Sequence, residues 1–367
     1  MSQSIPQVKI QITEDEIQSV VEVMRTGHIT QGSKVKLLEE HMSVLTRVPY
    51  AVATNNGTSA LHTALHAIGI KKGDEVITTP FTFIATANAI LMCGAVPVFA
   101  DIDPQTYILD PQSVEKVITK KTKAILVVNL YGQMAQYDEL KNIANAHKLF
   151  IVEDSAQSIN AEYKKEQSGS IGDIASFSFY ATKNIMCGEG GMVTTKNEDF
   201  FIRAQQFRQH GQPQGTRYVY NALGYNYRMT DIQAVIALEQ LKHIDEITER
   251  RRAIAQAYSK GLEGVKGIEL PTEYEYISHV YHQYTIKVNE NFSKNRDDLK
   301  EYLQSKSIST AIYYPQPLYN VTHLSQYRKI QCPVTENVVN QVLSLPMYPS
   351  LTDSEIEYII HSIRDIS

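Results

Sequence analysis

Residues 176–195 read Ser-Phe-Ser-Phe-Tyr-Ala-Thr-Lys-Asn-Ile-Met-Cys-Gly-Glu-Gly-Gly-Met-Val-Thr-Thr. Aromatic and hydroxyl residues alternate at the start, which predicts a half-buried strand. A Gly-Glu-Gly-Gly turn then leads to a second strand at 192–195. One lysine, Lys183, lies between the two strands. Desolvation can keep such an amine reactive and suited to Schiff-base chemistry. A solvated loop lysine is the more common case, so the role of Lys183 depends on the rest of the chain.

Length and composition limit the class of protein. The chain has 367 residues, more than a single core usually holds, so a large and a small domain are expected. A hydrophobic content of 43% and a charged content of 20% are typical of a soluble globular protein. The formal charge of −5 argues against a nucleic-acid partner bound by phosphate neutralisation. No apolar run approaches the roughly 18 residues of a membrane span, so no membrane partner is expected.

The cellular compartment is predicted from two features. Residues 1–10 lack the charged-then-apolar pattern of a signal peptide. The three cysteines are too few and too scattered for a disulfide framework or a zinc site, so no metal is expected. These features together predict a cytoplasmic protein.

The first two thirds of the chain alternate apolar strands with helical stretches. Continuous apolar runs of this kind indicate parallel strands that are buried on both faces of a sheet. The expected strands lie near residues 51–54, 75–79, 96–101, 122–130 and 150–154. The expected helices between and around them cover 13–26, 33–47, 84–92, 136–147 and 200–208. The fold class is therefore α/β.

The pattern changes towards the C-terminus. A single long helix is expected from Asp231 through the charged residues 245–252, as a solvated connection between two domains. After it we expect an edge strand, a helix, a second strand and a last helix, at 282–288, 296–306, 309–314 and 353–366. The predicted division is a large domain of residues 1–250, N-terminal helices included, and a small C-terminal α/β domain of residues 251–367.

Two further segments carry candidate site residues. An apolar strand breaks at Asn55-Asn56-Gly57, and a helix starts at Thr58 or Ser59. Free amides and hydroxyls at a helix N-terminus suit a phosphate, although an ordinary N-cap has the same composition. Asp154 ends an apolar strand, where ligands of open α/β sheets bind; a helix N-cap is the alternative. With Lys183, and an aromatic residue about 25 positions after the first segment, these features fit a pyridoxal phosphate site.

The ordered motifs closely resemble the DegT/DnrJ/EryC1/StrS family of sugar aminotransferases. The resemblance runs from about residue 10 to the C-terminus. It implies the aspartate aminotransferase fold (fold type I), with a mostly parallel seven-stranded sheet between helices in the large domain. The segments that carry it are Asn56-Gly57-Thr58-Ser59-Ala60-Leu61, 73–77, 81–86, 101–103, 130–133, Glu153-Asp154-Ser155-Ala156-Gln157, 176–195, 224–229 and 345–349.

The resemblance implies a role for each matching residue around the pyridoxal phosphate ring. Lys183 would form the Schiff base and then carry the proton shift. Asp154 would keep the pyridine nitrogen protonated, which makes the ring an electron sink. Gln157 would hydrogen-bond the phenolic oxygen, and Phe83 would stack on the ring.

The phosphate and a second subunit are implied in the same way. Gly57, Thr58 and Ser178 would bind the cofactor phosphate. Asn226 would reach the phosphate in the neighbouring subunit, so the resemblance implies a homodimer with active sites shared across the interface.

Two positions are expected near the substrate. Tyr314 lies where the family contacts the sugar nucleotide. Asn129 stands where family members often have histidine, before Leu130-Tyr131-Gly132, and bears on substrate choice. A related branch that performs dehydration replaces the lysine with histidine, so the presence of Lys183 favours transamination.

The implied function is transfer of an amino group from L-glutamate, which leaves as 2-oxoglutarate, to a nucleoside-diphosphate keto-sugar. Two alternatives stay open: an enzyme of the same fold that acts on a cyclitol or aromatic precursor, and a cofactor-binding regulatory protein without catalysis. The sequence does not distinguish dTDP, UDP or GDP, a keto group at C3 or C4, the configuration of the new amine, the end product of the pathway, or an oligomer larger than a dimer.

Overall fold

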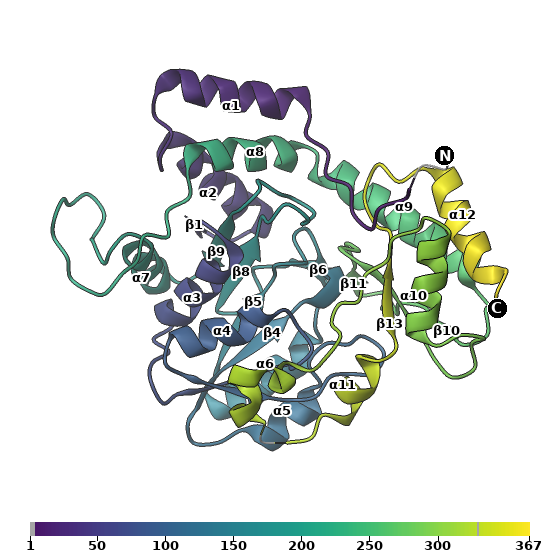
Figure 1. The fold of residues 1–367 in the computed structure, drawn as a ribbon. Helices are drawn as coiled ribbons and strands as arrows, with labels where there is room; N and C mark the ends of the chain where they lie inside the picture. Colours follow the sequence, from purple (N-terminus) through teal and green to yellow (C-terminus); the bar gives the residue numbers. More distant parts are fainter. Residues whose placement is uncertain (1–3, 329) are drawn as a thin grey trace.

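The computed structural model describes residues 4–328 and 330–367. Its centre is a seven-stranded sheet (Figure 1) in which β9 runs antiparallel to both neighbours and all other neighbouring strands are parallel. The predicted mostly parallel sheet is therefore confirmed. In spatial order the strands are β1 (Tyr50–Thr54), β9 (Gly191–Thr195), β8 (Ile174–Ser178), β5 (Phe150–Asp154), β4 (Thr122–Val128), β2 (Glu75–Thr78) and β3 (Val96–Phe99).

Helices cover both faces of this sheet, as the apolar runs predict. Along β4, Ala124 and Leu126 pack into one core and Ile125 and Val127 into another, because successive side chains of a strand point to opposite faces. The first core lies under α3 (Gly57–Ala67), α4 (Ile84–Met92) and α7 (Glu198–Arg208). The second lies under α5 (Pro111–Val117) and α6 (Tyr137–His147).

A smaller antiparallel sheet has its own core. It contains β10 (Ile268–Glu269), β12 (Tyr284–Val288) and β13 (Val342–Leu345), packed with α9 (Ile244–Leu262), α10 (Arg296–Ser305) and α12 (Asp353–Arg364). Ile5 also packs into this core and pairs with Ile308. The predicted boundary at residue 250 lies inside α9, and the division into residues 1–250 and 251–367 stays a prediction.

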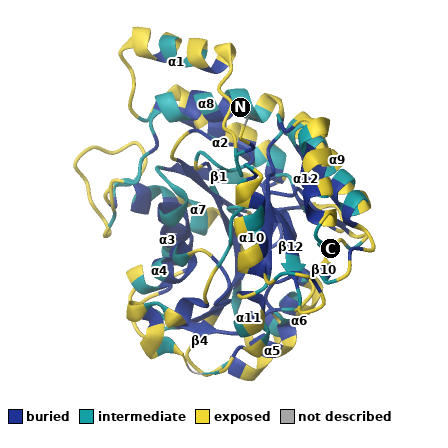
Figure 2. Cartoon of the chain, turned by 45° about the vertical axis from the view of Figure 1, so that its right-hand side comes forward, coloured by how far each residue is buried: buried dark blue, intermediate teal, exposed yellow. Residues whose placement is uncertain are grey.

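Three helices and one loop form the outer layer beside the first strand. α1 (Glu14–Thr26) lies along α8 (Asp231–Lys242), above α2 (Ser33–Thr46) (Figure 1). The loop of residues 209–223, between α7 and α8, projects away from the body of the molecule. Figure 2 shows that this loop and the outer face of α1 are largely exposed.

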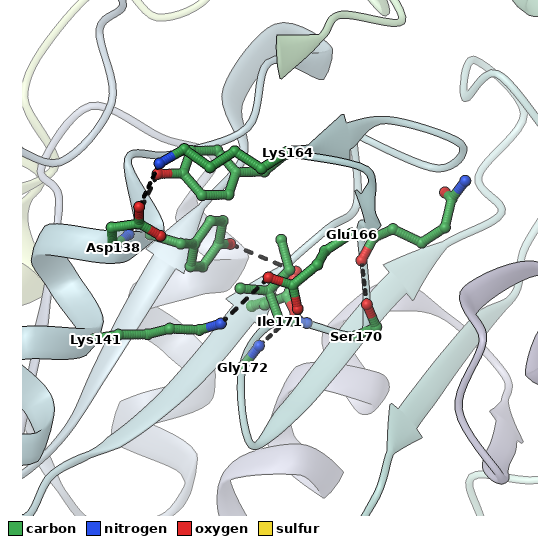
Figure 3. A network of polar contacts seen from close by, with 11 residues as sticks. Asp138, Lys141, Lys164, Glu166, Ser170, Ile171 and Gly172 are labelled. Atoms are coloured by element: carbon green, nitrogen blue, oxygen red, sulfur yellow. Dashed lines mark hydrogen bonds and ion pairs between the residues drawn. The ribbon is translucent and has the colours of Figure 1, made fainter. Parts of the chain in front are cut away.

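A third small sheet was not predicted from the sequence. Its strands β6 (Glu162–Tyr163), β7 (Glu166–Gln167) and β11 (Ile277–Ser278) are too short to give a periodic signal. Figure 3 shows how it is tied to α6: Lys164 of the hairpin reaches Asp138, and Lys141 reaches Glu166. The remaining elements are α11 (Pro333–Val338) and the short helices η1 (Leu130–Gly132), η2 (Leu318–Asn320) and η3 (Thr322–Tyr327).

Three sequence predictions in the C-terminal half are wrong. The predicted edge strand at 282–288 is β12, which lies in the middle of its sheet because both β10 and β13 pair with it. The predicted strand at 309–314 forms only the isolated pair Ala311–Ser344. The single long helix is two helices, because His243 (φ −110°, ψ 14°) interrupts the helical conformation. In the described residues, no helix combines the length and the apolar character that a membrane crossing needs.

Candidate active site

The topology of the large sheet gathers the predicted site residues at one edge. The carboxyl ends of parallel strands meet at the same edge, where ligands of open α/β sheets bind. The segments that follow β1, β2, β4 and β8 carry Gly57, Phe83, Asn129 and Lys183, and Asp154 is the last residue of β5. Ser178 is the last residue of β8.

Lys183 lies in a tight loop between β8 and β9. The loop is closed by backbone hydrogen bonds from the Ala181 amide to the Gly188 carbonyl (3.0 Å) and from Cys187 to Phe179 (2.9 Å). Burial lowers the pKa of Lys183 from 10.5 to about 8, although the charge of Asp154 acts in the opposite direction. An amine with this pKa is uncharged in a useful fraction of molecules near neutral pH. The more common case, a solvated loop lysine with an ordinary pKa, does not fit this lowered pKa.

Asp154 is buried at the end of β5. Its Oδ2 accepts a hydrogen bond from the Thr86 hydroxyl at 2.8 Å, and its Oδ1 accepts one from the Ala156 amide at 3.3 Å. Burial raises the pKa of Asp154, while the Thr86 bond, the Ala156 amide and the charge of Lys183 hold it down. Asp154 is thus a carboxylate near Lys183 that hydrogen bonds hold in place. A carboxylate of this kind is what a pyridine nitrogen needs in order to stay protonated.

The N-terminus of α3 forms an anion cradle against β8. The Asn56 side chain caps the helix by accepting from the Ser59 amide at 2.8 Å. The amides of Gly57 and Thr58 precede the first amide that this cap satisfies, so they remain able to bind an anion. A Cβ at Gly57 would lie only 2.8 Å from the Cβ of Ser178. Glycine is therefore required for the cradle to approach Ser178.

Gln157, Tyr314 and Phe83 lie together at the same edge. The Gln157 amide group donates to the Tyr314 hydroxyl at 3.2 Å, and its oxygen accepts from the Tyr131 amide at 2.7 Å. Phe83 precedes α4 and is 57% exposed, and the centroid of its ring lies 6.4 Å from that of the Tyr314 ring. An exposed ring on a fixed helix start can stack on a bound aromatic group.

Asn129, which is predicted to lie near the substrate, is fully buried after β4. Its side chain is 0% exposed, and its oxygen accepts from the Tyr137 hydroxyl (2.9 Å) and the Ala135 amide (3.2 Å). Its amide group donates to the Ser155 hydroxyl at 3.3 Å. Asn129 therefore supports the loop after β4, and its predicted role in substrate binding stays a prediction.

Asn226 lies on the segment that leads into α8 and that runs beside Asn55, two residues before Gly57. Its backbone segment is fixed, because the Asn55 amide donates to the Tyr227 carbonyl at 2.8 Å and the Tyr227 hydroxyl bonds His62 at 3.1 Å. The Asn226 side chain is exposed. Within the described residues, no hydrogen bond joins it to Lys183 or Asp154. This placement leaves the side chain available to a second subunit.

Two supporting residues were missed by the sequence analysis. Thr86 lies three positions after Phe83, one turn into α4, and holds Asp154. Tyr131 holds Gln157 through its amide, and its hydroxyl donates to the Tyr313 carbonyl. Thr86 lies within a quoted family motif, and Tyr131 lies within another, but neither motif indicates which neighbour the side chain contacts.

Comparison with known proteins identifies the family. The model of the DegT/DnrJ/EryC1/StrS aminotransferase family matches residues 10–364. The chain belongs to this family.

The similar proteins include a pleiotropic regulatory protein of Geobacillus stearothermophilus (40% identity over 94% of this chain and 92% of that protein). Two others are a UDP-2-acetamido-2-deoxy-3-oxo-D-glucuronate aminotransferase of Pseudomonas aeruginosa (37%; 94% and 93%) and a GDP-perosamine synthase of Escherichia coli O157:H7 (35%; 98% and 98%). A solved sugar aminotransferase structure from Streptococcus pneumoniae, in its PMP form, matches with a TM-score of 0.93 and 32% identity, over 99% and 98% of the two chains.

The aminotransferase is thus a pyridoxal phosphate enzyme of fold type I. Its own residues fit the cofactor: the Gly57 cradle accommodates a phosphate, Lys183 offers an amine of lowered pKa, and Asp154 offers a buried carboxylate. Among the described residues, no group of three or more His, Cys, Asp or Glu side chains is arranged to hold a metal ion.

Proposed function

We propose that this aminotransferase transfers the amino group of L-glutamate to the keto carbon of a sugar that is linked to a nucleoside diphosphate. The observation that carries the proposal is the partly buried amine of Lys183, whose pKa is lowered to about 8, beside the Thr86-supported carboxylate of Asp154. A general base works best when its pKa lies near the operating pH. Lys183 meets this condition.

The residues would act in two matched half-reactions. When bound, pyridoxal phosphate supplies an aldehyde for Lys183 and an electron sink for the proton shift. The amine of Lys183 would take the proton from the α-carbon of glutamate and return it to the cofactor carbon that keeps the nitrogen. In the second half-reaction it would carry a proton from that carbon to the sugar carbon that receives nitrogen. Asp154 would keep the pyridine nitrogen protonated throughout. Gly57, Thr58 and Ser178 would hold the phosphate, and Phe83 would hold the ring plane. The two half-reactions predict ping-pong kinetics.

The substrate class follows from the similar proteins. The Pseudomonas aeruginosa relative is named for a UDP-linked 3-oxo sugar acid, and the Escherichia coli relative for the synthesis of GDP-perosamine. Both names describe nucleotide-linked sugars, although the nucleotides differ. We therefore propose a nucleoside-diphosphate keto-sugar as acceptor, and an amino sugar for glycan, polysaccharide or secondary-metabolite synthesis as product. Tyr314, next to Gln157, is the proposed sugar-nucleotide contact.

The active form we propose is a homodimer in the cytoplasm. Large apolar side chains are exposed on the N-terminal helices, including Ile17, Met24 and Val44, and on the projecting loop, including Tyr218 and Leu223. A second copy of the chain that covered them would bury apolar surface. The exposed Asn226 would then approach the neighbouring phosphate. Three unpaired cysteines suit a reducing compartment.

A regulatory protein that binds the cofactor without catalysis has one observation in its favour, the name of the Geobacillus stearothermophilus relative. The first half-reaction separates the two functions. We expect the visible absorbance of the lysine-bound cofactor to shift to that of the amine form when L-glutamate is added, with release of one 2-oxoglutarate per site. A cofactor spectrum that glutamate leaves unchanged would refute transamination.

The second half-reaction identifies the acceptor. Enzyme preloaded with the amine form should convert one member of a panel of dTDP-, UDP- and GDP-linked 3-keto and 4-keto sugars, read as the mass of the amino sugar. Free cyclitol ketones form the comparison set. If only the free cyclitol ketones were converted and no nucleotide-linked sugar reacted, the acceptor would be a cyclitol and the proposed substrate would be wrong.

A further inference from the structure

A buried histidine lies behind the lysine loop, on the segment that leads into the small sheet. This histidine, His282, precedes β12. The segment is fixed to the loop after β4, because the Val280 amide donates to the Gly132 carbonyl (3.1 Å) and Gln283 donates to Tyr131 (3.2 Å). Gly132 has a φ of +100°, and a Cβ there would lie 2.9 Å from the backbone nitrogen of His282. The segment thus packs against the active-site loop at van der Waals distance.

The other side of this segment meets Asn184, the residue after Lys183. The Asn184 amide group donates to the Val280 carbonyl at 3.2 Å, and the Asn184 oxygen lies 3.2 Å from Nδ1 of His282. A carbonyl only accepts, so this bond fixes which end of the Asn184 amide faces the histidine. The oxygen also only accepts, and Nδ1 of His282 must therefore carry the proton. Both side chains are buried, with exposed fractions of 6% and 5%.

The charges around His282 favour its neutral form. Burial lowers the pKa of His282 well below 6.5, and the charges of Lys183 and Arg251 lower it further. Arg251 is close because its guanidinium donates to the carbonyls of Tyr281 (3.1 Å) and His282 (3.4 Å). The imidazole therefore acts on its surroundings as a fixed hydrogen-bond donor.

We propose that His282 is a positioning residue for Lys183. Its imidazole orients the Asn184 side chain, and that side chain holds the loop of residues 179–190 closed and keeps water away from the amine of Lys183. The pair connects β12 of the small sheet to the residue that follows the reactive lysine. The inference rests on the proposed function only in that Lys183 is the working amine.

The experiment measures the amine itself, in cofactor-free protein. Lys183 is labelled with acetic anhydride over a range of pH, and the labelled peptide is quantified by mass spectrometry. The wild type should show a labelling midpoint near pH 8. In His282→Leu, the Asn184 oxygen loses its donor, water enters the loop, and we expect the midpoint to rise by about one pH unit. His282→Asn offers an N–H near the Nδ1 position and should restore most of the wild-type midpoint.

Two further variants separate positioning from general damage. His66→Asn removes a histidine that stacks on Phe207 at the far end of α3, and should leave the midpoint of Lys183 unchanged. Asn184→Ala breaks the same bond from the other partner, so it should give the His282→Leu shift even if the leucine variant does not fold. The double variant should shift no further than either single one.

Unchanged midpoints in both His282→Leu and Asn184→Ala would overturn the proposal. So would additive shifts in the double variant, or a His282→Asn variant that behaves like leucine. Because the labelling uses neither cofactor nor glutamate, these outcomes do not depend on transamination. Failure of the glutamate reaction with an intact His282 effect would remove the proposed function alone.

Discussion

The hydroxyl of Thr86 donates a 2.8 Å hydrogen bond to Oδ2 of Asp154, and both side chains are buried. The bond joins the first turn of α4 to the end of β5, so one helix start carries both the exposed Phe83 ring and the support of the carboxylate. Burial alone would favour the protonated acid. The Thr86 hydroxyl counteracts that effect where the cofactor needs an anion.

We predict that Thr86→Val raises the pKa of Asp154, because valine has the same shape but no donor. A hydrogen bond to a charged group contributes about 1.5–3 kcal/mol, so the acidic limb of the profile of kcat/KM against pH should move up by about one pH unit. Thr63→Val is the matched control, since the Thr63 hydroxyl is buried and has no hydrogen-bond partner within the described residues. Equal profiles for Thr86→Val and wild type would contradict the assignment.

The lowered pKa of the partly buried Lys183 amine predicts a pH-dependent stability difference in cofactor-free protein. The folded-state pKa of Lys183, about 8, lies below the ordinary 10.5, so the unfolded chain binds more protons between these pH values. The burial penalty is present in full below pH 8 and disappears as the pH rises through 10.5. Lys183→Met removes the penalty and should stabilise the cofactor-free protein at pH 7 by at most about 3 kcal/mol, less the part that solvent contact screens.

Urea denaturation at pH 7 and pH 10 measures this difference. The advantage of Lys183→Met should shrink at the higher pH. The exposed Lys260→Met serves as control and should change the midpoint little at either pH. A methionine variant that is less stable than wild type at pH 7 would show that the amine is not desolvated.

Glu153, beside Asp154, is expected to stabilise the fold rather than act on the cofactor. It is 0% exposed, and its carboxylate accepts from the amides of Ile171 (2.7 Å), Gly172 (2.7 Å) and Gly169 (3.0 Å). Figure 3 shows Ile171 and Gly172 of this loop beside the hairpin that contains Glu166. Glu153→Gln places an N–H group against a backbone N–H, so we predict a loss of about 2–4 kcal/mol in the free energy of unfolding.

The control for this loss is Glu166→Gln. Glu166 is half exposed, and its ion pair with Lys141 spans 3.7 Å, so the loss there should be at most about 1 kcal/mol. Urea denaturation of the two variants gives the comparison. Equal losses would mean that the buried carboxylate is not the anchor of the 169–172 loop.

Much of the large sheet was predictable because its signals are local. Continuous apolar runs gave its parallel strands, and the helix at 84–92 agrees with α4 at both ends. The small sheet was less predictable. β12 has polar flanks in the sequence, and only the pairing of β10 and β13 on its two sides, from residues far away in the chain, makes it central. The break at His243 carries neither proline nor glycine, so no local residue signals it.

The candidate site, like the small sheet, could be predicted only in so far as its signals are local in the sequence. Lys183, Asp154 and Gly57 stand out in the sequence because each lies at or just after the end of a strand, and the parallel sheet brings strand ends together. Asn129 follows a strand too, yet it is buried with its hydrogen bonds satisfied by Tyr137, Ala135 and Ser155. Position after a strand therefore predicts proximity to the site, but the direction of the side chain depends on tertiary neighbours that no spacing rule contains.

The shared active site gives the last prediction. Asn226 is exposed, and its proposed target is the cofactor phosphate of the partner subunit. Asn226→Ala should weaken retention of pyridoxal phosphate about tenfold, the equivalent of about 1.4 kcal/mol, measured by fluorescence titration. Lys183→Ala should abolish the visible absorbance of the lysine-bound cofactor.

In mixed dimers of Lys183→Ala and Asn226→Ala subunits, one of the two sites would combine an intact Lys183 with an intact Asn226. We therefore expect up to half of the wild-type activity per mixed dimer, whereas each variant alone is impaired. Mixed dimers no more active than the separate variants would mean that each chain completes its own site.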